Sequence, residues 1–156
     1  MKDTNTINNC INPKIRLRFD TQEKFFGPGV CELLELIDET GSVQKACARM
    51  ELSYSKGSKM LKKLDQVIGI SMVERWTGGA GGGGARLTEA GKKLVKTYRK
   101  METEVQKAAE DAFYKYYGED FRNAITINSS ITEESIISLE KAIIDIQTGG
   151  TTDEAD

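Results

Sequence analysis

Apolar residues recur at helical spacing through the first half of the chain and predict a series of short amphipathic helices. Over 30–37 and again over 43–50 they stand at positions i, i+3, i+4 and i+7, which is one face of a helix. Gly41 is expected to end the first helix, and Ser42 is expected to cap the second. The pattern therefore predicts two successive helices with a very short connection.

A third helix is expected to open at Ser53 or Tyr54, after a short break, and to end at Gly69. The small residues Ala46 and Cys47 on the preceding helix would let the two helices cross closely, as in a helix–turn–helix. The predicted apolar face of the third helix consists of Met60, Leu64, Val67 and Ile68.

Strand signals lie on both sides of these helices. Basic and apolar residues alternate over 14–19, which predicts a short half-buried strand. Another strand is expected over 70–76 and the stub of a returning strand at 86–87, while the segment 77–85 between them is almost pure glycine. The sequence therefore predicts a hairpin with a glycine-rich tip after the third helix.

A long helix capped by Thr88 and ending near Gly118 is expected to follow. Its apolar residues keep heptad spacing, and such a stripe could pack against the first helix of the same chain. Because the helix extends past Met101, farther than a small domain can cover, the seam of a homodimer is favoured. A short amphipathic helix over 136–146, capped by Ser130 or Thr132, is predicted near the end. The expected dimer residues are Leu94, Tyr98, Met101, Val105, Ala108 and Ala112.

This order of elements predicts a fold that is mainly α with a small β-wing, a winged helix–turn–helix followed by a long dimerisation helix. Residues 1–13 are expected to be a flexible N-terminus and 14–91 the winged helix–turn–helix domain. The dimerisation helix is assigned to 92–117, and 118–156 to an acidic C-terminal segment with a short helix.

Charge is distributed unevenly, although the net charge of the chain is only −2. Gly41 to Lys100 carries 13 basic and 4 acidic residues, a net charge of +9. Met101 to Asp156 carries 4 basic and 13 acidic residues, a net charge of −9. A strongly basic segment of this kind indicates a polyanionic partner.

The composition excludes several classes of enzyme and metal site. With no histidine, the chain lacks the commonest general base and metal ligand, which rules out serine and cysteine hydrolases that depend on histidine. Cys10, Cys31 and Cys47 form no C-x-x-C pair, which argues against a zinc site and for a reducing compartment. No signal peptide or membrane-spanning apolar run is seen. We therefore expect a cytoplasmic non-enzyme with no cofactor, no metal and no membrane contact.

The third helix and the hairpin together predict an interface for double-stranded DNA. Lysine and small polar side chains on the helix would reach bases and phosphates in a major groove, and the bare backbone of the glycine tip would approach a phosphate. The alternative is an ordinary helical pair whose lysines form a solvated face. The predicted DNA-binding residues are Ser42, Lys45, Ser53, Tyr54, Ser55, Lys56, Lys59, Lys63, Arg75, Gly79, Gly82 and Arg86.

Two other functions compete with DNA binding. The run Gly78–Gly84 contains a G-x-G-x-x-G pattern, which could indicate a phosphate- or nucleotide-binding loop, but any glycine tract matches it. No acidic residue on a following strand and no Gly-Lys-Ser/Thr accompany it. The long helix and acidic end could instead belong to a helical protein-interaction adaptor.

A set of short motifs resembles the N-terminal DNA-binding domain of the ModE family of molybdate-responsive regulators, which is itself similar to the LysR-type winged helix–turn–helix. The resemblance covers about residues 14–115 and implies a homodimeric regulator of genes, joined through the long helix. The motifs are Phe26-Gly-Pro-Gly29, Leu33-Leu34, Glu39-Thr-Gly-Ser42, Ala46, Ser53-Tyr54, Leu61, Met72-Val-Glu-Arg75, Gly78-Gly79, Gly81 to Ala85 and Leu87-Thr-Glu-Ala-Gly91.

The chain departs from the family pattern in two respects. Gly57 stands where the pattern usually has Ala, and Ser58 where it usually has Trp, both on the third helix. Only 39 residues follow Tyr117, too few for the five-stranded barrel that binds the oxyanion in this family. We therefore expect no molybdate sensing, and no identifiable small-molecule effector, within this chain.

Overall fold

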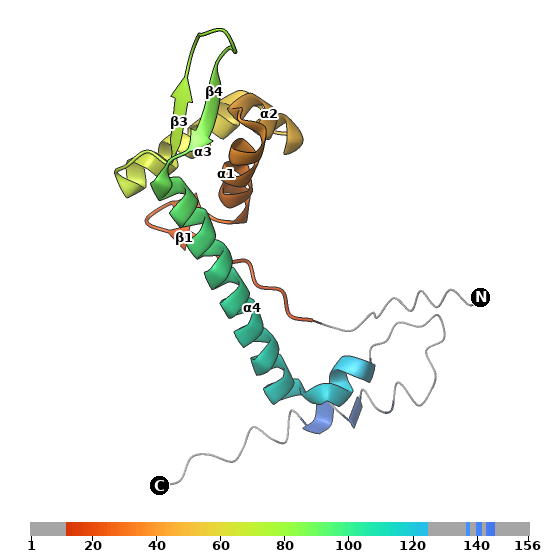
Figure 1. The fold of residues 1–156 in the computed structure, drawn as a ribbon. Coiled ribbons are helices and arrows are strands. Elements are labelled where there is room, and N and C mark those ends of the chain that lie inside the picture. The colour runs from red at the N-terminus through yellow and green to blue at the C-terminus, as the bar shows by residue number, and fades with distance from the viewer. Residues whose placement is uncertain (1–11, 125–136, 138–139, 142, 146–156) are drawn as a thin grey trace, which may run out of the picture. The chain divides into compact units, whose positions relative to one another are not determined.

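The computed structural model describes residues 12–124, 137, 140–141 and 143–145. Its eight elements follow one another in the order that the sequence predicts, except that β2 was not predicted (Figure 1). They are β1 (Phe19–Asp20), β2 (Lys24–Phe26), α1 (Pro28–Thr40), α2 (Val43–Arg49), α3 (Tyr54–Ile68), β3 (Val73–Trp76), β4 (Gly84–Leu87) and α4 (Glu89–Ala124). The protein is thus mainly α with a small β-wing, as predicted.

The helix ends are set by the residues expected to set them. Gly41 and Gly69 close α1 and α3 in the left-handed conformation, with φ of 67° and 86°, which costs glycine little. The Thr88 hydroxyl accepts a hydrogen bond from the Gly91 backbone N–H at 3.1 Å and caps α4. Gly118, with φ of 76°, interrupts the helical backbone of α4.

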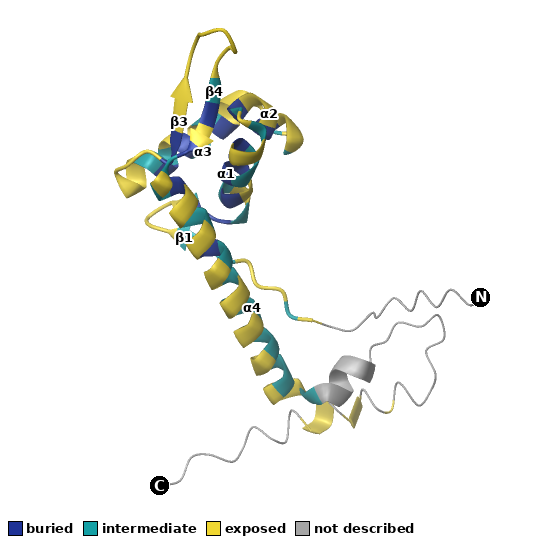
Figure 2. Cartoon of the chain, viewed as in Figure 1, coloured by how far each residue is buried: buried dark blue, intermediate teal, exposed yellow. Residues whose placement is uncertain are grey.

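The chain divides into two compact units, Arg16–Val105 and the described part of Met1–Ile15 with Gln106–Asp156. In the first unit, α1, α2 and α3 enclose a core with β3 and β4 (Figure 2). In the second unit, the Gln106 side chain accepts from the Ile15 backbone N–H at 3.1 Å and donates to the Pro13 carbonyl at 2.7 Å. Residues 1–11 and most of 125–156, including the predicted caps Ser130 and Thr132, lie outside the described residues.

The wing is the antiparallel β3–β4 hairpin of residues 73–87. Val73 pairs with Leu87 and Trp76 with Gly84, and the Ala85 N–H also donates to the Gly41 carbonyl at 2.9 Å. The Trp76 ring lies so close to Gly84 that a Cβ there would overlap it, so the wing depends on glycine at this position. The wing is therefore anchored at its base to the end of α1.

Two predictions from periodicity are wrong in detail. The strand expected over 14–19 is only Phe19–Asp20, because the backbone before it is held by a side chain: the Leu17 carbonyl accepts from the Tyr98 hydroxyl at 2.9 Å. The buried face of α3 is also rotated from the predicted one. Gly57, Leu61 and Leu64 are buried, whereas Val67 and Ile68 are exposed.

Tyr98 was predicted at a dimer seam but lies in the core of its own chain, with 1% of its surface exposed. Its ring meets Phe19 and Phe26 edge-on, at centroid distances of 5.7 and 5.0 Å. Leu94 is half-buried against the same core. The first turns of α4 therefore pack within the chain, and the assignment of Tyr98 to a dimer seam is corrected, while that of Leu94 stays a prediction.

Candidate nucleic-acid interface

The helix–turn–helix is formed by α2 and α3, which are joined by a turn of four residues, Met50–Ser53. Glu51 adopts a positive φ of 54° in this turn, and the Leu52 N–H donates to the Cys47 carbonyl at 2.9 Å. The turn thereby directs the chain from α2 into α3, and it places the N-terminus of α3 at the surface.

The two predicted serines at the helix starts act as caps. The Ser42 hydroxyl accepts from the Lys45 backbone N–H at 3.3 Å, and the Ser53 hydroxyl accepts from the Lys56 N–H at 3.2 Å. Their side-chain oxygens accept hydrogen bonds from backbone N–H groups in the first turns of α2 and α3. Because these oxygens are already used as caps, contacts to a ligand would come from the side chains that follow them.

Glycine at position 57 sets how closely α3 approaches α2. A Cβ at Gly57 would overlap the Cys47 Sγ, which is itself 1% exposed. Burial raises the pKa of the Cys47 thiol, and it raises the pKa of Cys31 to about 11, so both are protonated core groups. The close approach of the Cys47 Sγ thus explains why glycine stands at position 57, where the family pattern usually has alanine.

The outer face of α3 carries the predicted basic residues. Ser55, Lys56 and Lys59 are exposed, and within the described part of the chain neither lysine side chain has an ion-pair partner. Lys63 is half-buried and pairs with Glu23, whose pKa it lowers. The lysines of the first two turns are therefore free to neutralise external charge, while Lys63 is already partly compensated.

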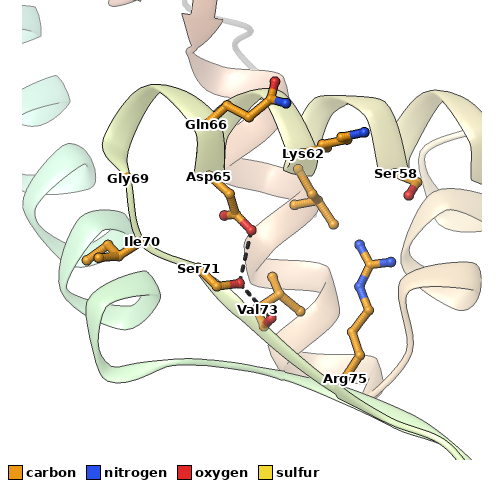
Figure 3. A pocket seen from close by; sticks show the side chains of 10 residues that line it. Ser58, Lys62, Asp65, Gln66, Gly69, Ile70, Ser71, Val73 and Arg75 are labelled. Atoms are coloured by element: carbon orange, nitrogen blue, oxygen red, sulfur yellow. Dashed lines mark hydrogen bonds between the residues drawn. The ribbon is translucent and has the colours of Figure 1, made fainter.

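A groove of about 620 Å³, the wing groove, separates α3 from β3. Figure 3 shows the Arg75 side chain extending from β3 toward Ser58 and Lys62 of α3. The Arg75 Nη1 donates to the Tyr54 hydroxyl at 3.4 Å, which links the wing to the first residue of α3. Lys62 was not selected from the sequence, because only the position of the wing shows that it lines this groove.

The other wing residues are less available than predicted. Arg86 pairs with Glu74 at 2.8 Å across the hairpin and lies over the Trp76 ring, at 5.9 Å from its centroid. Gly79 and Gly82 have the positive φ values of a tight tip, and the Gly82 N–H donates to the Gly79 carbonyl at 3.1 Å. The tip is thus a turn closed by its own hydrogen bond, and Arg75 is the cation of the wing that has no ion-pair partner in the described part of the chain.

The remaining heptad residues form a stripe on α4 that the described residues cover only in part. Met101 is 43% exposed, Ala108 and Ala112 are exposed, and Val105 is half-buried. On the same turns Arg99 donates to both carboxylate oxygens of Glu35 at 2.8 and 2.7 Å, which ties α4 to α1 and lowers the pKa of Glu35. The helix is thereby held by α1 near Arg99, while its apolar stripe continues beyond.

No group of three Cys, Asp or Glu side chains among the described residues is placed to hold a metal ion. No helix within that part of the chain is both long and apolar enough to cross a bilayer.

A helix–turn–helix with an exposed basic second helix and a β-hairpin wing beside it defines the class of winged helix–turn–helix domains. Residues 31–92 match the family described as bacterial regulatory helix-turn-helix protein, lysR family, so this part of the chain carries a LysR-type helix–turn–helix domain.

The chain is also similar in sequence to three proteins named ModE. The transcriptional regulator ModE of Yersinia pestis is 34% identical over 96 residues, which are 61% of this chain and 36% of that protein. The DNA-binding transcriptional dual regulator ModE of Escherichia coli K12 is 31% identical over 128 residues, 81% of this chain and 46% of that protein. The molybdenum transport protein ModE of Azotobacter vinelandii is 35% identical over 78 residues, 50% of this chain and 29% of that protein. The chain spans less than half the length of each of these relatives.

Proposed function

We propose that this protein binds double-stranded DNA in a sequence-specific manner as a homodimer and regulates transcription. The observation that carries the proposal is the exposed face of α3, where Lys56 and Lys59 stand beside a wing that contributes Arg75. Such a role requires the cytoplasmic location expected from the sequence.

In this proposal α3 enters the major groove and the wing follows the sugar–phosphate backbone. Because Ser42 and Ser53 serve as caps, base contacts fall to the exposed Tyr54, Ser55 and Lys56. Each good contact to a base edge contributes about 1–3 kcal/mol of discrimination. Lys45, Lys59 and Arg75 supply phosphate contacts, which carry no sequence information. Residues 14–91 would form the DNA-binding domain and 92–117 the dimerisation helix.

The salt dependence of binding tests this assignment. Lys59→Ala and Arg75→Ala should each weaken binding to a cognate duplex and lower the slope of log affinity against log salt by about 0.9, because each removes one phosphate contact. Mobility-shift titrations over a range of salt concentrations would measure this slope. Lys107→Ala, an exposed lysine on α4, is the matched control. Titrations that are unchanged for both test variants would overturn the DNA proposal.

The dimer is proposed to form through Met101, Val105, Ala108 and Ala112. Val105→Glu should convert the dimer to a monomer in multi-angle light scattering and weaken DNA binding, since a charge would be buried in an apolar seam. The control is Thr103→Glu, at an exposed position outside the heptad stripe. A Val105→Glu protein that remains dimeric would show that the seam lies elsewhere.

A further inference from the structure

A second groove, of about 460 Å³, lies against α3 and is lined by four cations, of which the sequence analysis selected only Lys63. Arg16, Arg18 and Lys24 reach it from the segment before α1, and Lys63 reaches it from α3. Its apolar lining includes Phe26 and Met60. We call it the arm groove.

The arm groove and the wing groove lie on opposite sides of the outer ridge of α3. Ser58 lines the wing groove and Met60 lines the arm groove. They precede and follow Lys59 in the sequence, so each lies about 100° from Lys59 around the helix axis, one on either side. Lys59 therefore stands on an exposed ridge with a groove on each flank.

The cations of the arm groove are compensated only in part. Arg18 pairs with Asp20 at 3.4 Å, and Lys63 pairs with Glu23. Arg16 and Lys24 are exposed and have no ion-pair partner among the described residues. Glu32 is the acidic residue in the lining. Two cations are thus available to an external anion.

We propose that the arm groove binds the phosphate backbone of DNA on the side of α3 opposite the wing. The inference rests on the proposed function. A helix in the major groove, which is about 12 Å wide, is bordered by two sugar–phosphate backbones. Arg75 in the wing groove meets one of them, and Arg16 and Lys24 meet the other.

The exposure of these side chains favours a polyanion over a small free anion. In water a single exposed ion pair contributes little, because solvent and salt screen it. A contact to a phosphate of duplex DNA contributes more than such an ion pair, because each neutralised phosphate releases condensed counterions. This release adds a large, salt-dependent contribution to the binding affinity. Exposed arginine and lysine side chains beside a recognition helix therefore suit a DNA strand.

The test is the double variant Arg16→Ala/Lys24→Ala. The salt slope should fall by about 1.8, and affinity should fall to a similar extent on cognate and unrelated duplexes, because phosphate contacts do not depend on sequence. Phosphate-ethylation interference should lose protection at one border of the half-site in this variant, and at the other border in Arg75→Ala. The control, Lys100→Ala/Lys107→Ala, removes the same charge from exposed positions on α4. Thermal unfolding is expected to be unchanged, because both test side chains are exposed.

Three outcomes would overturn the inference and can be told apart. If the wild-type protein binds no duplex DNA, the proposed function fails as well. If it binds and Arg75→Ala lowers the slope while Arg16→Ala/Lys24→Ala does not, only the arm groove assignment fails. If calorimetry with inorganic phosphate gives heat for the wild type but not for the double variant, and the salt slope is unchanged, the groove takes a free anion instead.

Discussion

Tyr98→Ala is expected to lower the free energy of unfolding by about 3–5 kcal/mol, the usual cost of deleting a buried aromatic ring. The ring is 1% exposed and packs edge-on against both Phe19 and Phe26, so its removal leaves a cavity under the first turns of α4. Burial raises the pKa of Tyr98 to about 12, which keeps the hydroxyl protonated as the donor to Leu17. Urea unfolding followed by circular dichroism measures the loss.

Tyr98→Phe separates the ring from its hydroxyl. This variant keeps the packing and loses one hydrogen bond, so a cost of about 1 kcal/mol is expected. Both losses should be independent of protein concentration, because the contacts lie within one chain. If the loss of unfolding free energy disappears at high protein concentration, Tyr98 lies in the subunit interface instead.

Gly57→Ala is expected to destabilise the helix–turn–helix, although alanine is the better helix former by about 1 kcal/mol. The added methyl group would overlap the buried Cys47 Sγ, and overpacking of a core costs about 1–3 kcal/mol. α3 would have to move away from α2, so DNA affinity should fall together with stability. Urea unfolding and mobility-shift titration measure the two effects.

The double variant Cys47→Ala/Gly57→Ala tests the cause directly. Removing the sulfur makes room for the new methyl group, so the double variant should be more stable than Gly57→Ala alone, with a coupling energy of at least about 1 kcal/mol. Gly29→Ala is the matched control, because it also lies in a helix but a Cβ there meets nothing within 4 Å. Additive effects of the two substitutions would contradict the proposed overlap.

Much of the fold could be predicted because helix ends are encoded locally. Ser42, Ser53 and Thr88 cap helices with their own side chains, and Gly41 and Gly69 end helices through their tolerance of positive φ. The glycine-rich segment likewise predicts a tight hairpin turn. These signals act within a few residues, so they can be found without knowing what the helices pack against.

The candidate interface was predictable only in part. Lys56, Lys59 and Arg75 are exposed, and Arg75 donates to the Tyr54 hydroxyl at the start of α3, in agreement with the charge pattern. Arg86 looked equally available but pairs with Glu74 across the hairpin. Lys62 and Arg16 went unselected, because their importance depends on which elements lie beside α3.

The alternation of apolar and polar residues, the caps and the glycines determined by themselves the order of the elements, the winged helix–turn–helix class and the basic character of the third helix. Tertiary structure alone decided which partner covers each apolar face. A heptad stripe on α4 is equally compatible with a second chain and with its own core, and the packing of Phe19 and Phe26 against Tyr98 resolves its first turns in favour of the core. Periodicity specifies the direction in which side chains point, but only packing specifies what they meet.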